Sequence, residues 1–279
     1  MNIWYVLCDS LPFEMLHWNF MKNAFLAVLI MTPLFGLLST SVVNGKMSFF
    51  SDALGHSAFT GIAIGSIFGI TVPTLAAVIF SILFALLFSY IRSKSSHTAD
   101  TLIGVFSSAA VALGIFIATM GGKSFSKYNT FLIGDVLSIT PNEITLLALV
   151  LLFVLAFFFL NSNRLTLVTI HPQLAASRSI PTRLTQTIFT VTIAVVVTLS
   201  ISSVGLLILN SLLVLPGAAS RNIARNLKQY HFISVLFALV SGILGLVISY
   251  YVGCSAGAAI SLVLAGLFVI SFCFRKVRA

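Results

Sequence analysis

The sequence predicts an all-α, polytopic integral membrane protein with about eight or nine transmembrane helices. Hydrophobic residues make up 59% of the 279 residues and charged residues only 8%, and the mean hydropathy is +1.12. Soluble domains carry roughly 25% charged residues. A helix that crosses a bilayer needs about 20 consecutive, mostly apolar residues, and the chain contains a series of such runs. We therefore expect a single transmembrane domain over residues 1–279.

The placement of the positive charges predicts how the chain is oriented. The net charge is +9, and most of the basic residues fall in short segments that would share one side of the membrane if every intervening span crosses it. These residues are Lys46, Arg92, Lys94, Arg164, Arg178, Arg183, Arg221, Arg225, Lys228, Arg275, Lys276 and Arg278. Positive charge of this kind marks cytoplasmic loops. We expect a cytoplasmic C-terminus, and the basicity does not call for a nucleic-acid partner.

The expected spans follow one another with short connections. In numbers they are 24–43, 48–70, 72–91, 101–120, 144–160, 184–203, 204–218, 233–252 and 256–274. Pro73 suits the first turn of the third span, and residues 121–142 form the longest external loop. The span 204–218 is short for a crossing, so the count stays between eight and nine. Met1 to Asn19 lack the basic start of a cleaved signal and are expected to lie outside or at the interface.

The second span carries the pair that organises the chain, Asp52 and His56. Residues four apart lie on one face of a helix, with Cβ atoms about 5–6 Å apart. A charged Asp near the middle of a span costs about 2.5–3.5 kcal/mol, so ionisable residues there are functional candidates. A carboxylate with an imidazole suits a divalent transition metal such as Mn, Zn or Fe rather than Cu(I). Two ligands do not close a site, and a second copy would supply the four that zinc prefers. A polar pair that only stabilises the bundle is the alternative.

The same span carries small residues at every fourth position, and these predict a close neighbour. They are Ala53, Ser57, Gly61, Gly65 and Gly69. Small side chains at this spacing let the backbone of a second helix approach closely. The packing face and the polar face would then be neighbours on one helix.

Other polar residues are expected to have structural roles. Asp100 falls at a helix start, where a carboxylate caps free N–H groups, and Gly134-Asp135 resembles a turn. The remaining histidines, His17, His97, His171 and His231, sit at span ends or in loops and are expected to be solvated. The cysteines Cys8, Cys254 and Cys273 have no metal-ligand spacing and are read as packing residues.

The sequence lacks the motifs of an enzyme or an ATPase. It has no G-x-S-x-G and no H-E-x-x-H. Gly122-Lys123-Ser124 imitates the end of a phosphate-binding loop, but Ile117 stands where the motif requires Gly. Energy for transport would have to come from a partner or from an ion gradient. A proton-coupled secondary metal carrier that uses Asp52 is therefore an open alternative.

Several motifs together resemble one known family. They are Lys46-Met-Ser-Phe-Phe-Ser-Asp-Ala-Leu-Gly-His-Ser-Ala-Phe-Thr-Gly61, Asp100-Thr-Leu-Ile-Gly104, Gly134-Asp-Val-Leu137 before Thr140-Pro141, Pro172-Gln-Leu-Ala-Ala176 and Val204-Gly-Leu-Leu-Ile-Leu-Asn-Ser-Leu-Leu-Val-Leu-Pro-Gly-Ala-Ala219. In this order they are similar to the bacterial ABC transporter permeases for zinc, manganese and iron.

The resemblance implies the permease subunit of an ATP-driven metal importer in the bacterial inner membrane. Such a subunit pairs with a second permease chain, identical or different, and works with cytoplasmic ATPase subunits and an extracytoplasmic metal-binding protein. The metal is the transported substrate, and no permanently bound cofactor is implied. By the resemblance, Asp52 and His56 line the metal path between the two permeases.

The resemblance also implies a coupling segment at about residues 170–181 that seats in the ATPase. Its residues are His171, Pro172, Gln173, Leu174, Ala175, Ala176, Ser177, Arg178, Ser179 and Ile180. The segment carries Ser179 where the family usually has Gly, and Pro181 follows shortly after. From the sequence alone, Pro172 is expected to begin a short helix here.

Overall fold

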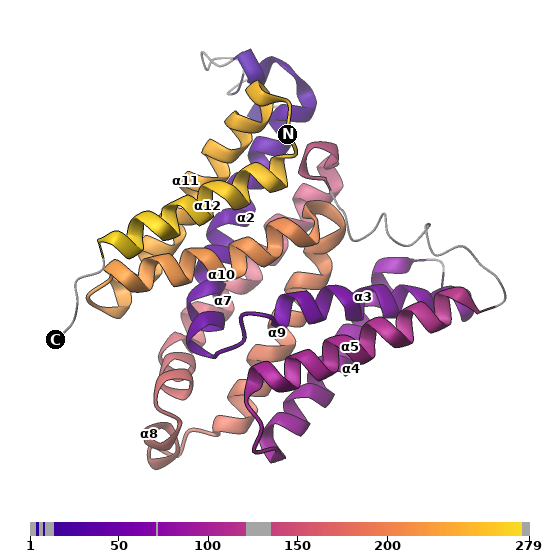
Figure 1. The fold of residues 1–279 in the computed structure, drawn as a ribbon, viewed down its shortest axis with the longest axis vertical. Coiled ribbons are helices and arrows are strands. Elements are labelled where there is room, and N and C mark those ends of the chain that lie inside the picture. The colour runs from indigo at the N-terminus through magenta and orange to yellow at the C-terminus, as the bar shows by residue number, and fades with distance from the viewer. Residues whose placement is uncertain (1–3, 6–7, 9–13, 71, 121–134, 275–279) are drawn as a thin grey trace. The chain divides into compact units, whose positions relative to one another are not determined.

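The computed structural model describes residues 4–5, 8, 14–70, 72–120 and 135–274, and within them every regular element is a helix (Figure 1). The elements in chain order are η1 (Glu14–His17), α2 (Asn19–Asn44), α3 (Phe50–Ile67), α4 (Pro73–Lys94), α5 (Ala99–Thr119), η2 (Val136–Ser138), α7 (Pro141–Ile170), α8 (Pro172–Ser177), α9 (Thr182–Val204), α10 (Leu206–Ile223), α11 (Leu227–Val252) and α12 (Ala256–Cys273). The loop with Gly122-Lys123-Ser124 and the basic C-terminal tail lie outside the described residues.

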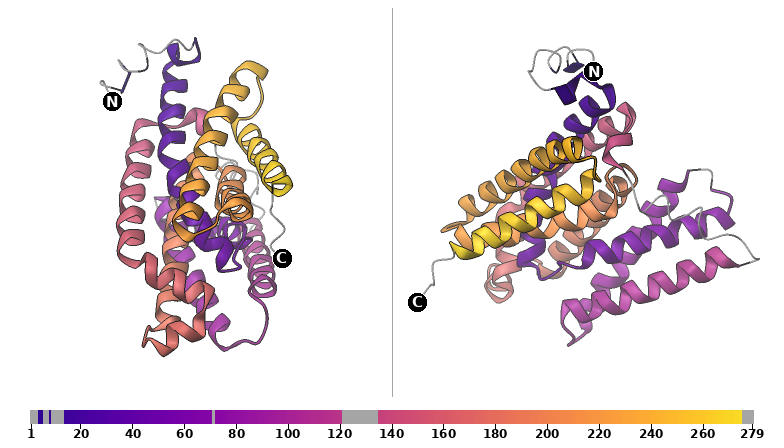
Figure 2. Two further views of the ribbon diagram at one scale, coloured as in Figure 1. Left: turned by 90° about the vertical axis from the view of Figure 1, so that its left-hand side faces the viewer. Right: turned by 45° about the horizontal axis from the view of Figure 1, so that its top comes forward.

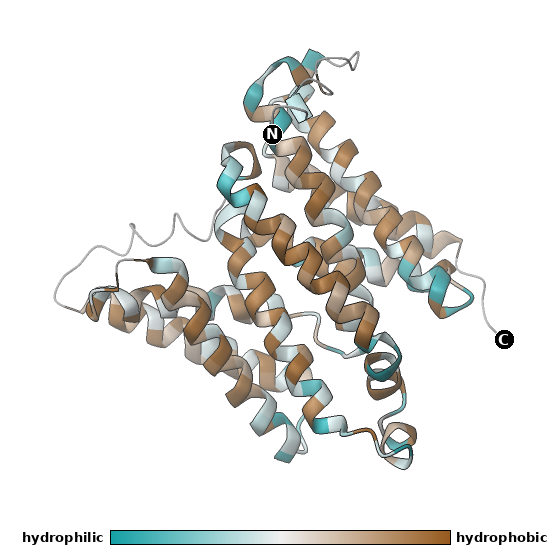
Figure 3. Cartoon of the chain, turned by 180° about the vertical axis from the view of Figure 1, so that it is seen from behind, coloured by the Kyte–Doolittle hydropathy of each residue, from teal (hydrophilic) through white to brown (hydrophobic). Residues whose placement is uncertain are grey.

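Long apolar helices dominate the described chain. Eight are long and apolar enough to cross a membrane, namely α2, α4, α5, α7, α9, α10, α11 and α12. The remaining long helix, α3, has 18 residues, but its Asp, His, Ser and Gly residues lower its hydropathy. Hydrophobic residues run along the helices, and hydrophilic ones gather near many helix ends (Figure 3). The prediction of an all-α, multi-pass membrane protein with about eight or nine spans is confirmed.

Several helices extend beyond the spans expected from the sequence, and three of them do so into the expected basic loops. α7 continues past Leu160 to Ile170 and contains Arg164, α10 runs on through Arg221, and α11 starts before Lys228. The expectation that these stretches are loops is wrong. Basic residues lie at the edge of the apolar layer of the membrane. A helix satisfies its own backbone hydrogen bonds, so it can continue past that edge into water.

The described chain divides into two compact units, each assembled from separate stretches of sequence. The first comprises Met1–Thr40, Asp135–Ala156 and Ser203–Ala279, and the second comprises Ser41–Gly134 and Phe157–Ser202. A single permease domain over the whole chain stays a prediction.

In the first unit, α10, α11 and α12 contact one another and run side by side (Figures 1 and 2). The part of α2 that belongs to this unit packs closely against α10 and α11. The Ser234 hydroxyl donates to the Gly36 carbonyl at 2.6 Å, and the Gly217 amide donates to Ser39 Oγ at 2.8 Å. A Cβ on Gly217 would lie 2.8 Å from the Ser39 carbonyl oxygen, so this approach requires glycine. Small residues thus set the distance between the helices of this unit.

In the second unit, α3 packs against both α4 and α5 (Figure 1). Phe50, at the start of α3, contacts Phe88 of α4 with ring centroids 4.9 Å apart. Phe106 of α5 meets Phe88 edge to face at 5.6 Å. Aromatic pairs in these arrangements are favourable beyond their buried area. They fix the beginning of α3, which is the part of the helix that carries Asp52 and His56.

Candidate functional site

Asp52 and His56 lie next to each other on one face of α3, as the sequence predicts. His56 Nε2 is 3.6 Å from Asp52 Oδ2, and the two side chains are 30% and 45% exposed, respectively. This separation is too long for a good hydrogen bond. Two ligand atoms on a tetrahedral ion, with bonds of about 2.1 Å, lie about 3.4 Å apart. The pair therefore fits two ligand positions around one metal ion with little movement.

The contacts of α3 with α4 and α5 leave this face partly exposed. The Thr60 hydroxyl donates to the Ala110 carbonyl of α5 at 2.6 Å. On another side of the helix, Ser57 Oγ lies 3.2 Å from Ser81 Oγ of α4. Asp52 and His56 remain partly exposed between these contacts. The pair is held on a rigid element and is still accessible.

Asp52 lies in the first turn of α3, close to the helix start. The residue at the N-cap is Phe49, whose side chain makes no capping hydrogen bond. Free N–H groups in the first turn and the positive end of the helix dipole favour a negative charge there. Asp52 is thus not placed in the middle of the helix, and the helix start stabilises its negative charge.

The stripe of small residues on α3 packs against α4 of the same chain. A Cβ added to Gly61 would lie 2.9 Å from Ala77 Cα, and one added to Gly65 would collide with the Ala76 side chain. The predicted close helix neighbour is therefore α4. Gly69 does not belong to the stripe, because it follows the end of α3 with φ at 69° and no neighbouring atom within 4 Å of an added Cβ. A left-handed backbone explains that glycine instead.

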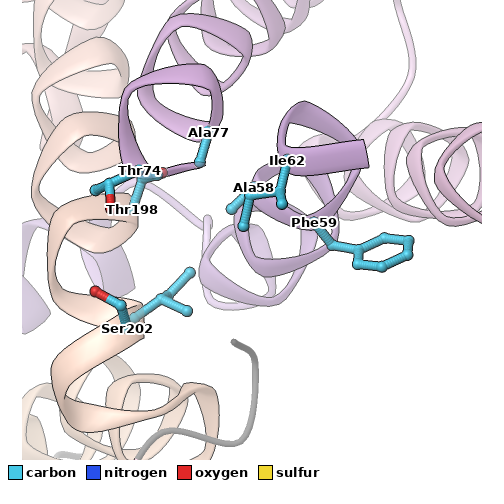
Figure 4. A pocket seen from close by; sticks show the side chains of 8 residues that line it. Ala58, Phe59, Ile62, Thr74, Ala77, Thr198 and Ser202 are labelled. Carbon is cyan, nitrogen blue, oxygen red and sulfur yellow. The ribbon is translucent and has the colours of Figure 1, made fainter. Parts of the chain in front are cut away.

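A small cavity of about 20 Å³ lies farther along α3, between α3, α4 and α9 (Figure 4). Thr74 of α4 and Thr198 and Ser202 of α9 bring hydroxyl groups to it, and Ala58 and Ile62 of α3 contribute apolar wall. Thr198 is 3% exposed, and its hydroxyl has no hydrogen-bond partner among the described residues. A cavity of this size holds one water. No pattern in the sequence indicates this group, because its members come from three separate helices.

The predicted coupling segment contains the short helix α8, which begins at Pro172 as expected. The helix ends in a Schellman motif. The Ser179 amide donates to the Ala176 carbonyl at 3.0 Å, and the Ile180 amide donates to the Ala175 carbonyl at 3.1 Å. Ser179 has φ at 56°, in the left-handed region that favours glycine. The conformation thus explains why glycine suits this position, and Ser179 adopts it at a conformational cost.

The surface of the coupling segment is largely open. Ala175 is fully buried, whereas Leu174 is 46% exposed and His171, Gln173 and Arg178 are exposed. An apolar side chain beside polar and basic groups on a short helix is suited to contact with another protein.

The remaining polar residues follow the predictions with two corrections. Asp100 lies in the first turn of α5, but the N-cap is Thr98, whose hydroxyl accepts from the Thr101 amide at 3.4 Å. Asp135 caps η2 by accepting from the Leu137 amide at 3.0 Å, in keeping with a structural role. His231 is not solvated, since it lies near the start of α11 with its Nδ1 2.8 Å from the Thr40 hydroxyl.

The other histidines and the cysteines are mostly as expected. His17, His97 and His171 are exposed. Cys8 is buried, whereas Cys254 and Cys273 are exposed, so packing explains only the first of the three. Within the described ranges, no three His, Cys, Asp or Glu side chains gather into a group that could hold a metal ion. Asp52 and His56 can therefore supply only part of a coordination sphere.

The fold and the site define a class of protein: a multi-pass helical membrane protein with an accessible carboxylate–imidazole pair on a tightly packed helix. The family model described as the ABC 3 transport family matches residues 17–275, and the chain belongs to that family.

Relatives and a solved structure extend this likeness along the whole chain. The chain is 28% identical to the high-affinity zinc uptake system membrane protein ZnuB of Haemophilus influenzae, over 91% of this chain and 97% of that protein. It is 26% identical to the manganese import system permease protein ScaB of Streptococcus gordonii, over 91% of each chain. In the solved structure of PsaBC from Streptococcus pneumoniae in complex with Fab, one chain matches with a TM-score of 0.78 and 26% identity, covering 98% of this chain and 95% of that one.

Proposed function

We propose that this chain is the membrane-spanning permease subunit of an ATP-driven importer of divalent transition metal ions, with Mn, Zn and Fe as the candidates. Membership of the ABC 3 transport family carries the proposal. Relatives named for zinc uptake and manganese import support the substrate class. The same names favour this function over a proton-coupled secondary carrier that uses Asp52. ATP hydrolysis is assigned to a separate partner subunit.

Asp52 and His56 are proposed to ligate the transported ion transiently. The 3.6 Å separation between Oδ2 and Nε2 supports this role because it matches adjacent positions around one metal ion. The pair supplies two ligands, and its partial exposure supports a second permease copy that adds two more. A transport site must also release its ion. Few ligands on an accessible face suit rapid exchange.

The partners are assigned by the same proposal. The segment from His171 to Ile180 is proposed to seat in the cytoplasmic ATPase, supported by the exposed Leu174 and Arg178 beside the buried Ala175. A second permease chain, identical or different, and an extracytoplasmic metal-binding protein complete the importer. A location in the bacterial inner membrane with a cytoplasmic C-terminus belongs to the same proposal, and the basic segments between the spans support that orientation.

The test is uptake of radioactive Mn, Zn and Fe into proteoliposomes that hold this chain with its ATPase and binding protein. Each metal is measured with internal or external ATP as the assembly requires, with a non-hydrolysable analogue, and with a pH gradient in the absence of the ATPase. We expect one or more of the metals to accumulate only when ATP is hydrolysed. Uptake by the chain alone, driven by the pH gradient, would establish the secondary carrier instead.

A further inference from the structure

The second unit contains a larger cavity, of about 300 Å³, that the transport site does not use. It lies where the end of α2 and the following turn, the end of α4, the end of α7 and the beginning of α9 come together. Its lining residues are Asn44, Gly45, Lys46, Met47, Arg92, Val168, Thr169, Ile170, Gln186, Phe189 and Thr190. This volume is at the lower end of the range for small-molecule sites.

The polar part of the cavity is built to attract an anion. Arg92 and Lys46 contribute two positive charges, and Gln186 adds a side-chain amide that can donate hydrogen bonds. The hydroxyls of Thr169 and Thr190 donate to the Leu165 and Gln186 carbonyls of their own helices, both at 2.8 Å. Arg92 Nη2 donates to the Gly45 carbonyl at 3.1 Å, which holds the guanidinium in place. No acidic residue is among the residues that line the cavity. Asp100 lies near enough to interact with the charge of Arg92 but is not part of the wall.

The apolar part of the cavity distinguishes its ligand from a simple ion. Met47, Val168, Ile170 and Phe189 form hydrophobic wall beside the two cations. A small inorganic anion has no apolar surface to bury against this wall. An amphiphile has a charged head that suits the cations and an apolar body that suits the wall. The cavity lies at the ends of apolar helices, at the level where the sequence places several of its basic segments. Basic pockets between transmembrane helices at this level bind anionic lipid headgroups.

We propose that this cavity binds a phosphate group, and that the group belongs to the headgroup of an anionic phospholipid. Arg92 and Lys46 pair with the phosphate, the Gln186 side-chain amide donates to its oxygens, and the beginning of the acyl chains lies against Ile170 and Phe189. Ile170 is the last residue of α7 and directly precedes His171. The bound lipid therefore contacts the chain at the start of the coupling segment.

The test compares lipids on the purified chain in a neutral detergent. Phosphatidylglycerol, phosphatidylcholine and inorganic phosphate are each titrated while thermal unfolding is followed, and bound lipid is counted by native mass spectrometry. A ligand at 100 times its dissociation constant stabilises the folded state by about 2.7 kcal/mol. We expect phosphatidylglycerol to raise the melting temperature by several degrees and to remain bound, and phosphatidylcholine at equal concentration to do neither.

Two charge-matched variants locate the effect. Lys46→Gln removes a cation that lines the cavity, whereas Lys94→Gln removes one from the same region that does not line it and whose amine donates to Tyr90 at 2.8 Å. We expect Lys46→Gln to lose most of the phosphatidylglycerol shift and Lys94→Gln to keep it. A shift from inorganic phosphate with the same variant pattern would support the phosphate site and assign it to a soluble source. Equal shifts in both variants, or none in the wild type, would overturn the proposal.

Discussion

The left-handed Ser179 at the end of α8 leads to a prediction with a definite sign. An L-residue in this region costs about 1–2 kcal/mol, whereas glycine adopts it freely but loses about 0.5–1 kcal/mol of additional chain entropy on folding. The difference leaves Ser179→Gly more stable by about 0.5–1 kcal/mol at the coupling segment. At 0.59 kcal/mol for RT, this corresponds to an equilibrium constant for opening of the motif that is about two- to fivefold smaller.

The motif has its own reporters in the amides of Arg178 and Ile180, which donate to the Ala175 carbonyl at 3.2 and 3.1 Å. Hydrogen exchange at these amides, measured with the protein in nanodiscs, should slow two- to fivefold in Ser179→Gly. Ser177→Gly is the matched control, because residue 177 is helical and its hydroxyl donates to the Leu174 carbonyl at 2.9 Å. The control should exchange faster. Unchanged or faster exchange in Ser179→Gly would refute the argument from backbone conformation.

Two further predictions concern packing and burial. Gly61→Ala should lower the free energy of unfolding by about 1–3 kcal/mol because the added Cβ meets the backbone of α4. The control Gly104→Ala lies in open space on α5 and should be neutral or stabilising. Thermal unfolding of both variants checks this, and equal losses would contradict it. Thr198→Val should leave stability unchanged or raised, since the lost hydroxyl has no partner among the described residues. Thr60→Val loses the hydrogen bond to the Ala110 carbonyl and should lower the free energy of unfolding by about 1 kcal/mol. If Thr198→Val lowered it by more than Thr60→Val does, the Thr198 hydroxyl would have a hydrogen-bond partner.

The sequence predicted most of the helices because their signals are local. Apolar runs, Pro73 and Pro172 as first helical residues, and the i, i+4 placement of Asp52 and His56 are all readable without knowledge of contacts. The stripe on α3 predicted a close helix neighbour but not its identity. Small side chains allow a close approach to any helix, so they do not indicate which helix approaches. Gly69 extends the same spacing and serves a turn instead.

The missed features depend on residues far apart in the chain. His231 pairs with Thr40, and the two cavities combine side chains from three or more helices. No spacing along the sequence reports such groups. The helix ends of α7, α10 and α11 were misplaced for a different reason, because charge marks the edge of the apolar layer and helices pass through it. The left-handed Ser179 was visible only as a departure from a family pattern until its φ angle was known.

The claim that Asp52 and His56 hold the transported metal is tested most directly by ATP-dependent uptake in two conservative variants. Asp52→Asn and His56→Gln keep the size of each side chain, and His97→Gln controls for loss of an exposed histidine elsewhere. The rates of metal uptake by the wild type and the three variants are compared per assembled complex, at metal concentrations below saturation. Loss of a metal's supporting groups typically costs 10–100-fold in affinity or activity, so we expect each site variant to lose at least about tenfold in uptake while His97→Gln transports normally. Wild-type uptake in both site variants would show that the pair is structural.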